Sequence, residues 1–109
     1  MFTVCVENWI NEKELVVKCE SKEQAENALK IIVNNFLEDF LIDNTMEEFN
    51  KGFGEYDSII KEGKFIIPYE ATIYINNMLP QEVEKLDKTP NHLGGCEVMT
   101  YKKFVEENM

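Results

Sequence analysis

Residues 2–7 (FTVCVE) and 15–20 (LVVKCE) each alternate apolar side chains with a second set that is mostly polar. This period of two is typical of half-buried strands. An antiparallel register brings the apolar set of both segments to one face. In that register Phe2 lies opposite Cys19, Val4 opposite Val17 and Val6 opposite Leu15. The two segments therefore predict a β-hairpin with its tip within residues 8–13. Its other face is expected to be polar, carrying Thr3 with Lys18 and Glu7 with Glu14.

A long amphipathic segment follows the hairpin directly. Ser21 and Gln24 have the spacing of a capping box, which marks a helix start. Eight apolar residues then recur on one face of a helical wheel. They are Ala25, Ala28, Leu29, Ile32, Val33, Phe36, Leu37 and Phe40. The pattern predicts a helix from about Lys22 to about Leu41, lying across the hairpin.

A second capping pattern starts the next part of the chain. Thr45 and Glu48 predict a brief helix that reaches about Lys51 and is ended by Gly52. Residues 53–63 fit either a short helix or a hairpin, and the sequence leaves both open.

Residues 64–69 and 72–76 are β-branched and aromatic, which predicts strands. Pro68 cannot donate to a strand ladder, so it is expected at an edge, a bulge or a break. Tyr69 and Tyr74 in this stretch are expected to be core or half-buried, as is Phe53.

The C-terminal part is expected to contain short elements. Pro80 suits the first turn of a helix, residues 89–95 have loop composition, and residues 96–99 can add a last strand. Thr100 would then cap a closing helix. Because regular alternation of strand and helix is missing, the order predicts a single α+β domain over residues 1–109 rather than a parallel sheet.

Composition places the chain among ordinary globular proteins, with 109 residues and 44% hydrophobic content. No run approaches the roughly 18 apolar residues of a membrane helix, and residues 1–6 do not resemble a secretory signal. Cys5, Cys19 and Cys96 are an odd number without metal-type spacing, which predicts reduced thiols and a cytoplasmic location.

Catalytic motifs are sparse. The single histidine, His92, stands four residues before Cys96 and lacks a second imidazole. Residues 52–54 (GFG) lack the further features of a phosphate-binding loop, and the acidic residues lack the order of a calcium-binding loop. We therefore expect no metal, no cofactor and no catalysis. A small enzyme that uses clustered carboxylates stays as a lesser alternative, with an acid-lined pocket and a contribution from His92 or Cys96.

Charge is the most informative property of the sequence. The net charge is −10, and all eleven basic residues are lysine. This disfavours direct binding to nucleic acid or anionic lipid, which depends on Lys and Arg. Seven acids lie between residues 38 and 57, opposed only by Lys51, so seven less one gives −6 of the total. The seven are Glu38, Asp39, Asp43, Glu47, Glu48, Glu55 and Asp57.

The acidic segment predicts docking on a basic protein. Clustered carboxylates can imitate a row of phosphates and are attracted to a positive groove. The leading hypothesis is a stoichiometric inhibitor that mimics nucleic acid on a nuclease or another nucleic-acid-binding protein. Phage anti-restriction and anti-CRISPR proteins and nuclease immunity proteins use this physics. The plainer interpretation is a solvated acidic rim that keeps the protein soluble. The oligomeric state is left open.

A second candidate contact is the hairpin tip, where Trp9 and Ile10 stand among polar residues. Tryptophan is enriched among interface hot spots, so the tip could dock or self-associate in a protein that is an adaptor rather than a mimic. The competing expectation is that Trp9 folds back onto the hairpin's own face.

Overall fold

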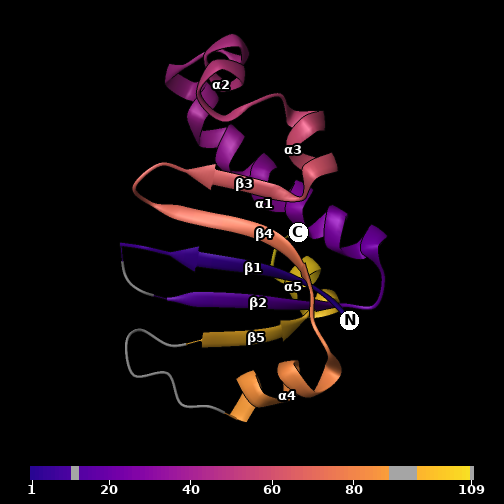
Figure 1. Cartoon of the computed structure of the whole chain (residues 1–109). Helices are drawn as coiled ribbons and strands as arrows, with labels where there is room; N and C mark the ends of the chain where they lie inside the picture. Colours follow the sequence, from indigo (N-terminus) through magenta and orange to yellow (C-terminus); the bar gives the residue numbers. More distant parts are fainter. Residues whose placement is uncertain (11–12, 89–95, 109) are drawn as a thin grey trace.

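A computed structural model of the chain describes residues 1–10, 13–88 and 96–108 (Figure 1). In chain order the elements are β1 (Phe2–Asn8), β2 (Glu14–Cys19), α1 (Lys22–Asp43), α2 (Met46–Phe53), α3 (Tyr56–Glu62), β3 (Lys64–Ile67), β4 (Ala71–Asn77), α4 (Pro80–Lys88), β5 (Cys96–Thr100) and α5 (Tyr101–Glu107). A hairpin, one long helix and a series of short elements confirm the predicted α+β fold.

The five strands form one sheet in the order β3-β4-β1-β2-β5 (Figure 1). Every neighbouring pair is antiparallel except β2 and β5, which are parallel. The hairpin register is the predicted one, with Val4 opposite Val17 and Glu7 opposite Glu14. Strand β3 is therefore an edge of the sheet, and β5 is the other edge.

Helix α1 packs on one face of the sheet, where it contacts β1, β2 and β4. Its buried residues are members of the predicted apolar stripe: Ala25, Ala28, Leu29, Val33 and Leu37. They meet buried side chains of the central strands, including Val4, Val17 and Ile73. The hairpin and the helix thus form the core that their apolar patterns predict.

The second face of the hairpin is less polar than expected. Thr3 is fully buried, and Cys5 and Val16 on the same face are buried as well. A buried hydroxyl is tolerated when it is hydrogen-bonded, and Thr3 Oγ1 donates to the carbonyl oxygen of Asn76 at 3.3 Å. This face is therefore buried at its centre, while Glu7 and Lys18 are half-buried and Glu14 is exposed.

The helix starts agree with their capping patterns. Ser21 Oγ accepts from the Gln24 N–H at 3.2 Å at the start of α1, and Thr45 with Glu48 forms a reciprocal capping box at α2. Helix α1 ends at Asp43, close to its predicted end at about Leu41. The prediction that Gly52 ends the second helix is wrong: α2 passes through it, because a glycine inside a helix only weakens it.

Residues 56–62 form helix α3, which decides between the two alternatives for this segment. Gly63 ends the helix in the left-handed conformation, with φ of 71°, and its N–H donates to the carbonyls of Ile59 and Ile60. A side chain at this position would be strained, and its Cβ would lie 3.3 Å from Ile75 Cδ1. The glycine therefore reverses the chain directly from α3 into β3.

The C-terminal elements follow the prediction with one exception. Pro68 immediately follows edge strand β3, and Pro80 begins α4. Tyr69 is 90% exposed with φ of 66°, so its expected burial is wrong; it lies in the turn after Pro68. Tyr74 and Phe53 are half-buried as expected. Thr100 caps α5, while the expected loop at 89–95, with His92, lies outside the described residues.

None of the helices in the described ranges is both long and apolar enough to cross a membrane.

Candidate protein-binding surface

The C-terminal half of α1, together with α2 and α3, lies at one end of the molecule (Figure 1). We call this region, residues 36–62, the acidic lobe. It contains all seven acids of the charged segment, and every one of them is exposed. The fold thus keeps on the surface of one lobe the charge that the sequence concentrates.

A cluster of phenylalanine rings fixes the lobe to the sheet. Its rings have neighbouring centroids 5.1–6.3 Å apart. The members are Phe36 and Phe40 of α1, Phe49 and Phe53 of α2, and Phe65 of β3. Phe49 and Phe65 are fully buried. Aromatic pairs at such spacings contribute roughly 0.5–1.5 kcal/mol each beyond their burial. The helices that carry the acids are therefore packed firmly against the sheet.

Two of the seven acids have local structural roles. Glu48 Oε1 accepts from the N–H and the hydroxyl of Thr45, both at 3.2 Å, in the capping box of α2. Glu47 lies 3.7 Å from the Lys51 ammonium, one turn along the same helix. This exposed pair contributes little to stability, and it removes only one charge from the lobe.

The other five acids form no ion pair within the described part of the chain. They are Glu38, Asp39, Asp43, Glu55 and Asp57. The first three stand near the C-terminus of α1, where no basic residue lies in the last turn. Carboxylates are disfavoured there because the helix dipole presents its negative end. Local helix stability therefore does not explain them.

Apolar side chains lie among these acids, which the sequence reasoning missed. Ile42 is 75% exposed, and Leu41 and Met46 are exposed as well. The available signal was that Ile42 falls off the apolar stripe of α1. The lobe therefore exposes apolar as well as acidic side chains.

The hairpin tip is a second exposed surface. Trp9 is 52% exposed and Ile10 is 72% exposed, so Trp9 does not fold fully back onto the hairpin. The Trp9 N–H donates to the Glu70 carbonyl at 2.8 Å, which places the tip beside the turn that contains Tyr69. The sequence placed Tyr69 in the interior, although its position after Pro68 signals a turn.

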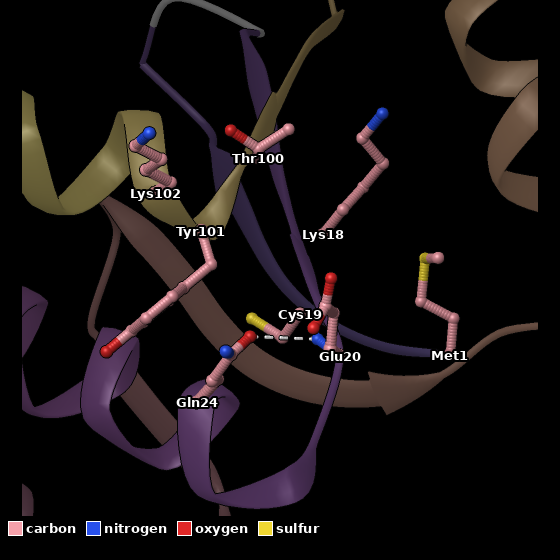
Figure 2. Close-up of a pocket in the computed structure, with 8 residues that line it drawn as sticks. All are labelled: Met1, Lys18, Cys19, Glu20, Gln24, Thr100, Tyr101 and Lys102. Atoms are coloured by element: carbon pink, nitrogen blue, oxygen red, sulfur yellow. Dashed lines mark hydrogen bonds between the residues drawn. The ribbon is translucent and has the colours of Figure 1, made fainter.

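A pocket of about 430 Å³ lies where β2, α1 and α5 meet (Figure 2). It is lined by Met1, Lys18, Cys19, Glu20, Gln24, Thr100, Tyr101 and Lys102. The Glu20 N–H donates to Gln24 Oε1 at 2.9 Å, the dashed line of Figure 2. Burial raises the pKa of the Cys19 thiol to about 11, so it is protonated at neutral pH and is a poor nucleophile. With one carboxylate and two lysines, this pocket differs from the acid-lined one that the enzyme alternative predicts.

A smaller pocket of about 160 Å³ lies against the second face of the sheet, between Cys5, Glu7 and Tyr74, among others. Tyr74 Oη donates to Glu7 Oε1 at 3.0 Å. Burial raises the pKa values of Tyr74 and Cys5, so both groups hold their protons at neutral pH. Neither Cys5 nor Cys19 is thus activated for covalent chemistry. Across residues 1–10, 13–88 and 96–108, no three metal-ligating side chains gather into a binding site.

Comparisons with protein-family models, curated proteins and solved structures gave no match for this chain.

Proposed function

We propose that this chain is a stoichiometric protein-binding domain whose acidic lobe occupies a basic, nucleic-acid-binding surface of a partner protein and so inhibits that partner. A nuclease is the kind of partner that fits, whether the chain acts as a phage anti-restriction or anti-CRISPR inhibitor or as a nuclease immunity protein. The observation that carries the proposal is a set of five exposed carboxylates, without ion pairs among the residues that the structure describes, on a lobe packed around phenylalanine.

The physical basis is the same as in binding of a polyanion. A groove that binds nucleic acid presents Lys and Arg to phosphates, and bound counterions leave when an anion docks. Carboxylates fixed on a packed lobe can take the place of phosphates without ordering a flexible chain first, which limits the entropy lost on binding. The nearby Ile42, Leu41 and Met46 would add contacts that do not depend on salt.

The test compares two variants of equal net charge. The lobe variant carries five substitutions: E38Q, D39N, D43N, E55Q and D57N. The control variant replaces five exposed acids elsewhere, namely E14Q, E70Q, E84Q, E97Q and E106Q. Each change moves the net charge from −10 to −5.

Displacement of a fluorescent DNA duplex from short poly-lysine is the readout. We expect the parent and the control variant to compete with DNA at about 50 mM salt, and competition to weaken steeply towards about 200 mM. The lobe variant should compete at least about tenfold less well. Equal losses in both variants, with circular dichroism showing both folded, would mean that only net charge matters and would contradict the proposal.

A second candidate function is that of an adaptor or self-associating subunit that binds through the hairpin tip. The observation favouring it is that Trp9, Ile10 and Tyr69 are exposed in two adjacent turns. Such binding would be insensitive to salt, because its contacts are apolar.

A further inference from the structure

Strand β3 is an edge of the sheet, and two of its residues line a groove. The Ile75 N–H donates to the Gly63 carbonyl at 2.8 Å, and the antiparallel register continues through Phe65 opposite Ile73. Hydrogen-bonded pairs alternate along such a ladder. Phe65 and Ile67 therefore face β4 with their backbone groups, while the N–H and C=O of Lys64 and Ile66 point away from the sheet.

These outward groups are unsatisfied within the described ranges, where no backbone or side-chain group bonds to the backbone of Lys64 or Ile66. Ile66 is also 44% exposed. An edge strand with unpaired N–H and C=O groups is a template for one more strand. Its length of four residues, with Pro68 directly after it, restricts pairing to a short segment.

A groove of about 380 Å³ runs beside this edge. Its walls are α3, the end of α2 and β3, and its lining is Phe53, Gly54, Glu55, Ser58, Ile59, Glu62, Lys64 and Ile66. Its charged lining residues are two glutamates, Glu55 and Glu62, and one lysine, Lys64. The groove therefore combines apolar side chains, an acidic excess and an unpaired strand edge, and most of its lining belongs to the acidic lobe.

We propose that the groove binds an extended, lysine- or arginine-containing segment of a partner protein, which adds to β3 as a sixth strand. Alternate side chains of an added strand point to opposite faces. The set that points into the groove would be cationic, so that its charged groups reach Glu55 and Glu62 while its methylene stems lie against Phe53 and Ile59. A second copy of this chain is disfavoured as the occupant because two bodies of charge −10 repel. The inference rests on the proposed function, since it specifies how a basic partner engages this lobe.

The test uses a short, end-blocked peptide of alternating lysine and valine as the probe. Its control has the same side chains but is N-methylated at alternate residues, which removes donors for strand pairing. We expect the unmodified peptide to bind the parent roughly tenfold more tightly at low salt. It should also slow hydrogen exchange at the Ile66 N–H and leave the exchange of Phe65 and Ile67, which face β4, unchanged. Equal binding of both peptides, or an Ile66 N–H that stays unprotected in the complex, would overturn the proposal.

A pair of variants tests the same point from the protein side. Ile66→Pro removes the outward N–H and spares the β4 ladder, which is the setting in which an edge strand tolerates proline. Ile66→Val keeps the N–H and serves as the matched control. We expect I66P to bind the peptide roughly tenfold more weakly than I66V; equal affinities of two folded variants would overturn the proposal. If I66P does not fold, hydrogen exchange on the parent decides.

The acidic function and strand addition can be refuted independently of each other. If the lobe variant fails to compete with DNA while I66P binds the peptide like I66V, the acidic function stands and strand addition is wrong. If I66P loses the peptide while the lobe variant still competes, strand addition stands and the acidic function is wrong. Dimerisation of the parent without peptide, abolished by I66P in sedimentation, would show that a second copy is the occupant and would overturn the choice of a basic segment.

Discussion

The acidic lobe and the hairpin tip both expose large apolar side chains, but their chemistry differs. In the lobe, the exposed Ile42 belongs to a segment rich in carboxylates, and that lobe is packed around phenylalanine rings. At the tip, Trp9, Ile10 and Tyr69 lie in two turns joined by the hydrogen bond from the Trp9 N–H to the Glu70 carbonyl. Electrostatic attraction steers a partner to the first surface and is weakened by salt. The second surface would bind through apolar contacts alone. The salt dependence of binding therefore distinguishes the two surfaces.

The lobe depends on its phenylalanine base, so Phe49→Ala is expected to have the largest effect. The side chain is fully buried, and its ring centroid lies 5.1–6.3 Å from those of four other rings, Phe36, Phe40, Phe53 and Phe65. Truncation of such a residue costs about 3–5 kcal/mol in the free energy of unfolding. Urea denaturation measures it, with the exposed Leu41→Ala as the control at about 1 kcal/mol or less. Similar losses for both variants would show that the base is not tightly packed.

The hairpin side should respond to alkaline pH. The Cys19 pKa is raised from 9.0 to about 11 by burial, so between these values the unfolded chain releases a proton that the folded chain keeps. The contribution of this thiol to the free energy of unfolding is therefore fully present below pH 9. It is lost as the pH rises from 9 towards 11, by on the order of 2–3 kcal/mol. Urea denaturation at pH 8 and pH 10.5 measures this loss. Cys19→Ala should lose less over the same interval, and the lobe variant should lose as much as the parent. An unchanged loss in Cys19→Ala would rule out this thiol as the cause.

The smallest expected effect on stability is at the tip. Trp9→Ala removes a ring that already keeps about half of its surface in water, so the loss should be about 1 kcal/mol or less. The variant should compete with DNA for poly-lysine as well as the parent does. If it instead abolishes salt-insensitive self-association measured by sedimentation, the tip is the functional surface and the adaptor function replaces the acidic one.

The local sequence pattern was sufficient to predict those features of the structure that neighbouring residues decide. The hairpin register follows from alternation, and Ser21, Thr45 and Thr100 begin their helices as capping predicts. The exposure of the seven acids was also predictable, because charged side chains are rarely buried without partners. Two positions show the limit of such reasoning. Gly52 does not end its helix, and Tyr69 is on the surface although its neighbours are strand-like.

The sequence by itself determined the α+β class, the hairpin and its long helix, and the concentration of charge between residues 38 and 57, because periodicity, caps and charge are properties of short segments. The tertiary structure alone decided that β5 pairs in parallel with β2, that five phenylalanines from three elements meet under the acids, and that β3 becomes an edge beside a groove. These features join residues far apart in the chain. Their contacts depend on how whole elements pack, which no single segment encodes.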